Sequence, residues 1–390
     1  MDISTLIGPS NADVIVFNKG GRALRLDRID SGEEAPREFF YGFFDLAKAG
    51  IRAAMMSSSG AVPGWRGLIA DRIERGLAYA TGLGVRPFST RIGSAALNAP
   101  RVLMSYTDGF SLSLGLGMAR GPGRPILIGG FHGLSDVESR IRMLPDIASR
   151  HIIGRCLAGL DHVFFFGPAD REEAIRRYGL SPERCSVIPF GVDTEFWRPL
   201  SDEPSADFVV AVGQDSNRDY GLLASAPGNH PTVIVTHQKL AVPSGSTHVR
   251  ITSGDFYAPG SMSDQDLRRL YNQARAVIVP LKDVYQPSGY SVTLQAMSCG
   301  RPVILSNIRG LWAPELLRDG ENCLLVPPGD AAALGAAIAR VRSDPALRER
   351  LGRAARETAV RHFGLDRIAA GTVALAKLGL SLHAQSRQAA

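Results

Sequence analysis

The chain has 390 residues, and this length predicts two or three domains. Its composition, 45% hydrophobic and 21% charged, is that of an ordinary soluble globular protein. No uncharged apolar run is long enough to predict a membrane-spanning helix. The net charge of +6 favours anionic partners, such as nucleotide phosphates, a phospholipid surface or nucleic acid, but does not choose among them.

The N-terminal segment and the cysteines both predict a cytoplasmic protein. The first residues lack a basic segment followed by a long apolar one, so we expect no secretion signal. The cysteines form no CxxC pair and have no histidine at zinc-ligand spacing, so we expect reduced and mostly buried thiols. They are Cys156, Cys185, Cys299 and Cys323.

Strands and helices alternate through the first half of the chain. A short buried strand is expected at 13–17, and Pro36 begins a helical pattern that ends at Gly50. Further strands, separated by helical stretches, are expected at 101–106, 125–128, 162–166 and 186–189. This alternation predicts a parallel, doubly wound sheet.

A hydrophilic segment at 198–207 interrupts the pattern and is interpreted as a linker. Strands then resume at 208–212, 232–235, 276–279, 303–305 and 323–326, and the chain is almost wholly helical from Asp330 onward. We therefore predict two Rossmann-like α/β domains, residues 1–199 and 200–363, facing a central cleft. A C-terminal helix at 364–390 is expected to pack back on the first domain.

A polar, glycine-containing loop opens the most informative segment, residues 285–304. The loop contains Gln286, Ser288 and Gly289 and runs straight into a helix that Gly300 ends. Unpaired backbone N–H groups at a helix N-terminus, together with the helix dipole, suit a phosphate. Ligands of open α/β sheets lie at the carboxyl ends of the strands, where this loop is expected. An ordinary helix start with a polar cap is the alternative.

Five segments, in order along the chain, resemble the retaining glycosyltransferases of family 4, which have the two-domain GT-B architecture. They are residues 190–199, 212–220, 262–281, 285–297 and 317–330. The resemblance is strong from about residue 160 to 361 and thinner before that. It implies transfer of a hexose, with retention, from a UDP- or GDP-sugar to a glycan, lipid or lipid-linked acceptor in cell-envelope or polysaccharide biosynthesis. It implies neither a cofactor nor a bound metal.

Catalysis in such enzymes is largely electrostatic, because the departing diphosphate is neutralised while positive charge builds on the sugar. Arg218 stands where the family carries a phosphate-binding Lys or Arg, and its guanidinium would clamp phosphate oxygens. Gln214 occupies a position where the family often has a second basic residue. An ion pair of Arg218 with Asp215 or Asp219 is the alternative role.

The phosphate loop departs from the family pattern of two glutamates separated by seven residues. The first glutamate faces the donor sugar, and the second accepts hydrogen bonds from the ribose. Here Gln295 takes the second position, and Gln286 takes the first approximately. Because a glutamine still accepts and donates hydrogen bonds, we interpret the loop as a subfamily variant. The residues assigned to donor binding are Gln286, Ser288, Gly289, Tyr290, Ser291, Gln295, Gly213 and Met262.

Two residues of the first half complete the predicted catalytic set with Arg218. His132 follows the strand at 125–128 and resembles the family's histidine that contacts the donor sugar. A histidine satisfied by a neighbouring carbonyl is its alternative. Asp108 follows the strand at 101–106 and would accept a hydrogen bond from the acceptor hydroxyl or cap a helix.

One apparent metal motif is interpreted differently. Asp264, Gln265 and Asp266 have the DxD form that holds a divalent ion in other glycosyltransferases. Because Ser263 precedes them and a helical pattern follows, we expect Ser263 to be an N-cap with Asp266 completing a capping box.

Residues 65–84 form an amphipathic helical pattern broken by Gly67 and Gly76, with apolar residues at helical spacing and arginines beside them. These are Trp65, Leu68, Ile69, Ile73 and Leu77, with Arg66, Arg72 and Arg75. Such a segment would dock peripherally on the anionic inner face of the cell membrane, near a lipid-linked acceptor. The alternative is a sheet-covering helix whose apolar stripe faces the core. We expect no nucleic-acid partner, because no binding motif is present.

Two other functions remain open. A catalytically silent GT-B subunit that binds a sugar nucleotide is consistent with the loss of both glutamates. A GT-B nucleotide-sugar epimerase would need a carboxylate base, which the sequence does not place.

Overall fold

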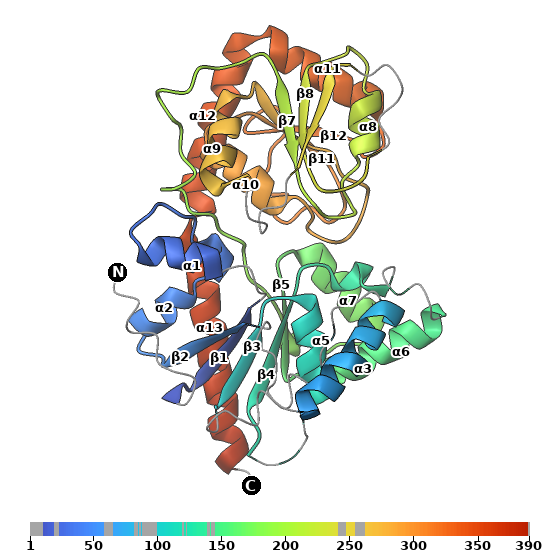
Figure 1. The fold of residues 1–390 in the computed structure, drawn as a ribbon, viewed down its shortest axis with the longest axis vertical. Helices are drawn as coiled ribbons and strands as arrows, with labels where there is room; N and C mark the ends of the chain where they lie inside the picture. The colour runs from blue at the N-terminus through green and yellow to red at the C-terminus, as the bar shows by residue number, and fades with distance from the viewer. Residues whose placement is uncertain are drawn as a thin grey trace. The chain divides into compact units, whose positions relative to one another are not determined.

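The computed structural model describes residues 11–18, 23–57, 65–81, 85, 87, 100–118, 121, 123–138, 141, 145–240, 247–253 and 262–388 (Figure 1). It divides into two α/β units. Unit 1 comprises Met1–Asp30, Phe39–Pro189 and Ile368–Ala390, and unit 2 comprises Ser31–Glu38 and Phe190–Arg367. The chain therefore enters unit 2 twice, first with the short segment Ser31–Glu38 and then with the main body of the unit.

Unit 1 contains a six-stranded parallel sheet in the order β2-β1-β3-β4-β5-β6. The strands are β1 (Val14–Asn18), β2 (Ala53–Ser57), β3 (Val102–Ser105), β4 (Ile126–Phe131), β5 (His162–Phe165) and β6 (Cys185–Val187). The helices described in this unit are α1 (Ala23–Asp30), α2 (Phe43–Lys48), α3 (Trp65–Thr81), α5 (Asp108–Gly117), α6 (Asp146–Gly159), α7 (Pro168–Tyr178) and α13 (Leu365–Gln388).

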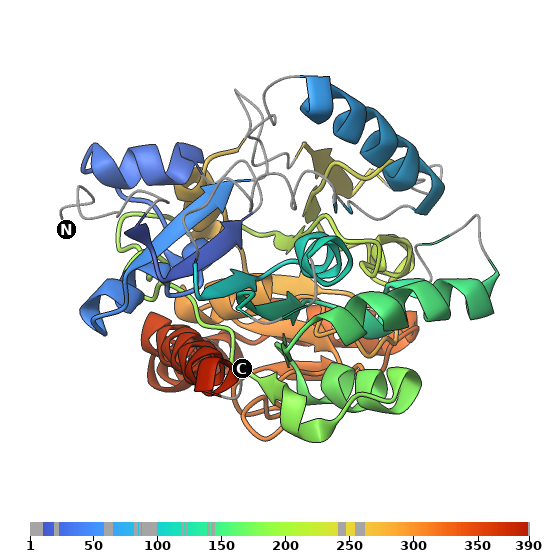
Figure 2. The ribbon, with the colours of Figure 1, turned by 90° about the horizontal axis from the view of Figure 1, so that it is seen from below.

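Alternate residues of the unit 1 strands face opposite layers of helices, as the pleat requires. Leu103 and Leu127 join the core cluster with residues of α5 and α6. The neighbouring Val102 and Ile128 instead lie against Gly379 of α13. Figure 2 shows α5 and α13 on opposite sides of these strands. The sheet is therefore doubly wound, with both faces buried.

Unit 2 contains a second six-stranded parallel sheet, in the order β12-β11-β10-β7-β8-β9. Its strands are β7 (Val209–Val212), β8 (Thr232–Val235), β9 (Val249–Thr252), β10 (Ala276–Val279), β11 (Val303–Ser306) and β12 (Leu324–Val326). Its helices are α8 (Tyr220–Ser225), α9 (Asp264–Gln273), α10 (Tyr290–Ser298), α11 (Ala331–Ser343) and α12 (Pro345–His362). The chain builds outward from β7 through β8 to β9 and then crosses to β10, so the topological switch point lies between β7 and β10.

The structure confirms the predicted strands and adds two that the sequence patterns did not indicate, β2 and β9. Both are at sheet edges. The single helix expected after Pro36 is wrong, because positive φ angles at Tyr41 (51°) and Gly42 (72°) break it. A 3-10 turn, Glu38–Phe40, precedes the break and α2 follows it. All four cysteines are buried and free, as expected.

Candidate functional site

Two loops meet at the carboxyl edge of the unit 2 sheet, at its topological switch point. One follows β7 and contains Gly213 and Arg218, and the other follows β10 and ends at Gly289. Main-chain hydrogen bonds join the loops, with Lys282 N donating to Asn217 O at 2.9 Å. The strand order therefore brings Arg218 beside the N-terminus of α10, although it lies 71 positions before Gly289 in the sequence.

Two glycines make room for the Arg218 guanidinium. A Cβ atom at Gly213 would lie 2.2 Å from Arg218 Nε, and one at Gly289 would lie 2.9 Å from Nη1. Both glycines also have positive φ angles, 152° and 81°, which side chains rarely adopt. A larger residue at either position would therefore strain the backbone and displace the guanidinium.

The Arg218 side chain is only 3% exposed, and its charge is incompletely matched. Nε lies 3.1 Å from Asp215 Oδ2, so the ion pair weighed as the alternative is present. Nη1 is buried, and it has no hydrogen-bond partner within the parts of the chain that the structure describes. Asp215 is itself shared, since Ser288 Oγ donates to its Oδ1 at 2.8 Å. A buried guanidinium N–H without an acceptor is costly, and a bound anion would satisfy it.

The N-terminus of α10 lies open beside this guanidinium. Gly289 is the N-cap in a left-handed conformation, and no side chain caps the helix. The N–H groups of the first turn have no acceptor within the helix, and they lie at the positive end of the helix dipole. Tyr290, the first helical residue, packs its ring 4.3 Å from that of Phe190, which fixes the start of the helix, and Ser291 follows it half-buried.

The remaining donor-binding candidates have different surroundings. Gln286 is buried, and its Oε1 accepts a hydrogen bond from Asn217 Nδ2 at 3.2 Å, so it belongs to the same pair of loops. Met262 is half-buried just before α9, and its role stays a prediction. The DxD segment forms the expected capping box, in which Ser263 Oγ accepts from Asp266 N at 3.0 Å and Asp266 accepts in return.

Gln295 points into unit 2, where it contacts a buried carboxylate. Its Nε2 donates to Glu38 Oε1 at 3.1 Å, and its Oε1 accepts from Tyr271 Oη at 3.4 Å. Glu38 also accepts a hydrogen bond from Trp197 Nε1 at 2.7 Å. The predicted ribose contact of Gln295 stays a prediction, and it would compete with these internal partners.

Glu38 gives a physical reason for glutamine at position 295. The Glu38 side chain is fully buried, and burial raises its pKa to about 7 despite the hydrogen bonds from Trp197 and Gln295. A glutamate at 295 would place a second carboxylate against it, and two buried carboxylates cannot both ionise cheaply. The amide instead donates a hydrogen bond to Glu38 and adds no charge.

In unit 1, His132 and Asp108 lie together at the carboxyl ends of neighbouring strands. His132 follows β4, and its backbone N donates to Asp108 Oδ1 at 2.8 Å. Asp108 is the first residue of α5, after the N-cap Thr107, so it is not the N-cap that the alternative proposed. The His132 ring stacks on Phe166 at 4.6 Å, and its Nε2 lies 3.2 Å from Tyr41 Oη. The oxygen in this contact is that of a phenol.

A second carboxylate holds the chain just after His132. Asp170, fully buried at the start of α7, accepts hydrogen bonds from Ser135 N at 2.9 Å and Leu134 N at 3.2 Å. Burial raises the Asp170 pKa to about 7, although these bonds oppose the shift. Asp108 and Asp170 therefore fix both ends of the short loop that presents the imidazole.

Helix α3 has its apolar stripe on the outside. It runs without a break through Gly67 and Gly76, and Trp65, Leu68 and Tyr79 are 67%, 74% and 85% exposed. The sheet-covering alternative, in which the stripe faced the core, is therefore wrong. The inward positions are Gly67, Ala70 and Glu74. Within the described residues, no helix has the length and apolar character needed to cross a membrane.

Several residues that shape these sites gave no local signal in the sequence. Glu38 and Gln295 are 257 positions apart, and Tyr41 and His132 are 91 apart. The helix start PADREE does mark Asp170 as a first-turn acidic residue. Nothing in that pattern indicates that its carboxylate turns to a loop on another strand.

Two family models match the chain, and neither overlaps the other. Residues 57–196 match the model of Glycosyltransferase Family 4, and residues 233–344 match that of Glycosyl transferases group 1. Among curated relatives, an alpha-maltose-1-phosphate synthase of Mycobacterium tuberculosis is 28% identical over 53% of this chain and 60% of its own. A D-inositol 3-phosphate glycosyltransferase of Streptomyces bingchenggensis is 28% identical over 58% of this chain and 55% of its own. The chain thus spans less than two thirds of these relatives' lengths.

Solved structures share the fold along nearly the whole chain. Sucrose-phosphate synthase from Thermosynechococcus elongatus superimposes with a TM-score of 0.66 at 19% identity, covering 95% of this chain and 99% of that one. Anabaena HepE, solved in complex with UDP-glucose, has a TM-score of 0.61 at 16% identity, covering 93% and 98%. With its two doubly wound parallel sheets, the chain has the GT-B fold and belongs to glycosyltransferase family 4, the glycosyl transferases group 1.

Proposed function

We propose that the protein is a retaining hexosyltransferase that uses a UDP- or GDP-sugar and needs no bound metal. The observation that carries the proposal is Arg218 Nη1, a buried cationic N–H without an acceptor beside the uncapped start of α10. A nucleoside diphosphate supplies the missing acceptors and two negative charges. Anabaena HepE, which shares the fold, was solved with UDP-glucose.

The donor-side residues would act on the leaving diphosphate. As the sugar–phosphate bond breaks, negative charge grows on the diphosphate, and Arg218 and the first N–H groups of α10 stabilise it. These donors are already in place, so they need little reorganisation in the transition state. Ser288 is held by Asp215, and Gln286 by Asn217, which fixes the loop that would receive the phosphates.

The unit 1 residues would act on the sugar and the acceptor. We assign contact with the donor sugar to His132, whose ring is fixed by Phe166 and Tyr41. Asp108 accepts from the His132 backbone, so we assign it the role of a positioning residue in addition to the predicted contact with the acceptor hydroxyl. The acceptor would be a glycan, lipid or lipid-linked sugar of envelope or polysaccharide biosynthesis.

The outward face of α3 supports an acceptor that lies at the anionic, cytoplasmic surface of a membrane. Its exposed residues combine Trp65, Leu68 and Tyr79 with Arg72 and Arg75. Aromatic and aliphatic side chains flanked by arginines are typical of helices that lie in the plane of a membrane interface. A helix that packed only against protein would instead turn these side chains inward.

Liposome flotation tests this membrane contact. We expect binding to vesicles of phosphatidylglycerol, weaker binding to phosphatidylcholine, and loss of binding in Leu68→Glu. Ile147→Glu is the matched control, because Ile147 is 83% exposed on α6 of the same unit. Equal binding by the two variants would contradict the proposal. A dimer in solution that only Leu68→Glu dissociates would assign the face to a second copy of the chain.

Donor hydrolysis tests the transferase itself. The wild-type protein is incubated with UDP-, GDP- and ADP-sugars in EDTA, and thermal stability is measured with the same panel. We expect one donor to raise the melting temperature and to be slowly hydrolysed. Stabilisation without turnover, even with membrane extract as acceptor, would instead support the catalytically silent binding subunit. That alternative is consistent with Gln286 and Gln295 in place of the family's two glutamates.

A further inference from the structure

A pocket of about 610 Å³ lies in unit 2 at the amino ends of its strands. Arg275 in this pocket immediately precedes β10, and Arg301 lies two residues before β11. The candidate donor site lies at the carboxyl ends of the same strands. The two sites therefore occupy opposite edges of one sheet, and we name this one the amino-edge pocket.

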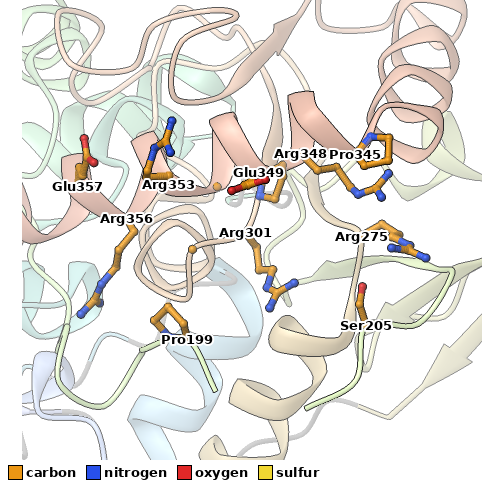
Figure 3. Close-up of a pocket in the computed structure, with 13 residues that line it drawn as sticks. Pro199, Ser205, Arg275, Arg301, Pro345, Arg348, Glu349, Arg353, Arg356 and Glu357 are labelled. Carbon is orange, nitrogen blue, oxygen red and sulfur yellow. The ribbon is translucent and has the colours of Figure 1, made fainter. Parts of the chain in front are cut away.

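The amino-edge pocket is rich in arginine. Five arginines and two exposed glutamates line it, so its net formal charge is positive. The arginines are Arg275, Arg301, Arg348, Arg353 and Arg356. In Figure 3, Arg348, Arg353 and Arg356 extend from α12, and the Arg301 guanidinium lies between Pro199 and Ser205.

Two of the arginines are held by backbone carbonyls. Arg356 Nη1 donates to Ser298 O at 2.8 Å, and Arg348 Nη1 donates to Arg342 O at 2.7 Å. These contacts fix α12 and hold both guanidinium groups, while Asp207 and Asp344 act on Arg348, and Glu195 on Arg356, through their charges. The two glutamates of the pocket, Glu349 and Glu357, are exposed.

Arg301 and Arg275 retain unused donors. Within the described residues, the Arg301 side chain has neither a hydrogen bond nor an ion pair, and its Nε is buried. Arg275 Nε is also buried without a hydrogen-bond partner, and its nearest carboxylate, Asp207, is 3.8 Å away. Asp207 is mainly engaged by Arg342, at 2.6 Å. Buried N–H groups of this kind favour an oxyanion that can accept from them.

We propose that the amino-edge pocket binds a phosphomonoester, with Arg301 and Arg275 donating to its phosphate and Arg348 adding positive charge. A phosphomonoester has three acceptor oxygens and a charge near −2, which suits several guanidinium groups. The pocket volume of about 610 Å³ exceeds that of a phosphate and leaves room for an organic group of the size of a sugar. The site is separate from the donor site and does not depend on the proposed function.

Binding of inorganic phosphate and glucose 6-phosphate, measured by calorimetry at constant ionic strength in chloride, tests the proposal. We expect wild-type protein to bind both, in competition with each other. Arg301→Gln should weaken both affinities by about tenfold or more, since charge-assisted hydrogen bonds are lost. Arg218→Gln should leave them unchanged, because Arg218 belongs to the donor site; a loss in that variant would place the phosphate there and overturn the proposal.

Arg350→Gln is the matched control. Arg350 is exposed on α12, like Arg353, but lies outside the pocket and donates to Gly320 O. Arg301→Gln breaks no internal contact, so we expect it to fold; Arg275→Gln provides an independent second variant. Equal phosphate affinity in the Arg301, Arg275 and Arg350 variants would overturn the proposal, as would inorganic phosphate that glucose 6-phosphate cannot displace.

Discussion

The two candidate loop regions, one in each unit, satisfy their polar groups in opposite ways. In unit 2, Arg218 keeps a buried hydrogen-bond donor that has no acceptor among the described residues, and no side chain caps the start of α10. In unit 1, the carboxylates of Asp108 and Asp170 accept hydrogen bonds from the backbone N–H groups of His132 and Ser135. The first arrangement is ready for an anion, and the second holds a side chain in place. The difference is consistent with the proposed roles, in which unit 2 neutralises the phosphates and unit 1 positions the sugar.

The largest expected effect comes from Arg218→Gln, which removes the incompletely matched cation and leaves a shorter, neutral polar side chain. We expect kcat/KM for donor hydrolysis to fall about 10²–10³-fold, as for other lost electrostatic donors. The ion pair of Nε with Asp215 is lost as well, so we expect the melting temperature without ligand to fall modestly, while Nη1 loses no partner. Arg309→Gln, an exposed arginine of the same unit paired with Asp283, is the control. Turnover within threefold of wild type would remove Arg218 from the mechanism.

The buried Glu38 makes the stability of unit 2 depend on pH. Its pKa is raised from 4.5 to about 7 in the folded protein, so the folded state binds the extra proton. The resulting stabilisation is complete below pH 4.5 and is lost as the pH rises to about 7. We expect Glu38→Gln to remove about 3 kcal/mol of this pH dependence in denaturant titrations. Parallel wild-type and variant curves between pH 4.5 and 7 would contradict the assignment. The pKa of Asp170 is also raised, but its pH dependence is the same in the wild type and in Glu38→Gln, so it cancels in the comparison.

Gln295→Glu tests whether Glu38 dictates the glutamine. We expect a loss of about 2 kcal/mol in unfolding free energy at pH 8, because a second buried carboxylate replaces a donor. The loss should shrink at pH 5, where one of the pair is protonated. The double variant Glu38→Gln/Gln295→Glu restores a carboxylate–amide pair and should recover most of the stability. A double variant no more stable than Gln295→Glu would show that the pair is not coupled.

The smallest expected effect is that of Asp108→Asn. Asparagine Oδ1 still accepts from the His132 backbone N, so turnover should stay within about threefold of wild type. Asp108→Ala removes the acceptor and should cost about tenfold in kcat/KM. Equal, large losses in both variants would show that the carboxylate charge itself takes part in the reaction.

Sequence patterns predicted the central strands because these are uninterrupted apolar runs, such as AVIV in β10. They missed the edge strand β2, whose sequence AAMMS has weak strand propensity, and β9, whose VRIT is half-exposed. The period of α3 predicted a helix but not which side faces outward. That orientation depends on Gly67, Ala70 and Glu74, which pack inward in the folded unit.

The candidate sites were predictable only where they follow from strand order. Arg218, Gly289 and His132 each follow a predicted strand, so their places at the carboxyl edges could be expected. The partner of Gln295 could not, because Glu38 lies in the short segment Ser31–Glu38, which the chain contributes to unit 2 before returning to unit 1. A contact over 257 positions leaves no trace in local spacing.

The most direct test of the diphosphate site is calorimetric titration of UDP, GDP and ADP, and of the corresponding nucleosides, in EDTA. We expect wild-type protein to bind one nucleoside diphosphate far more tightly than its nucleoside. In Arg218→Gln, the affinity for that diphosphate should fall toward that of the nucleoside. Equal affinities for diphosphate and nucleoside in the wild type, or no change in Arg218→Gln, would contradict the proposed site.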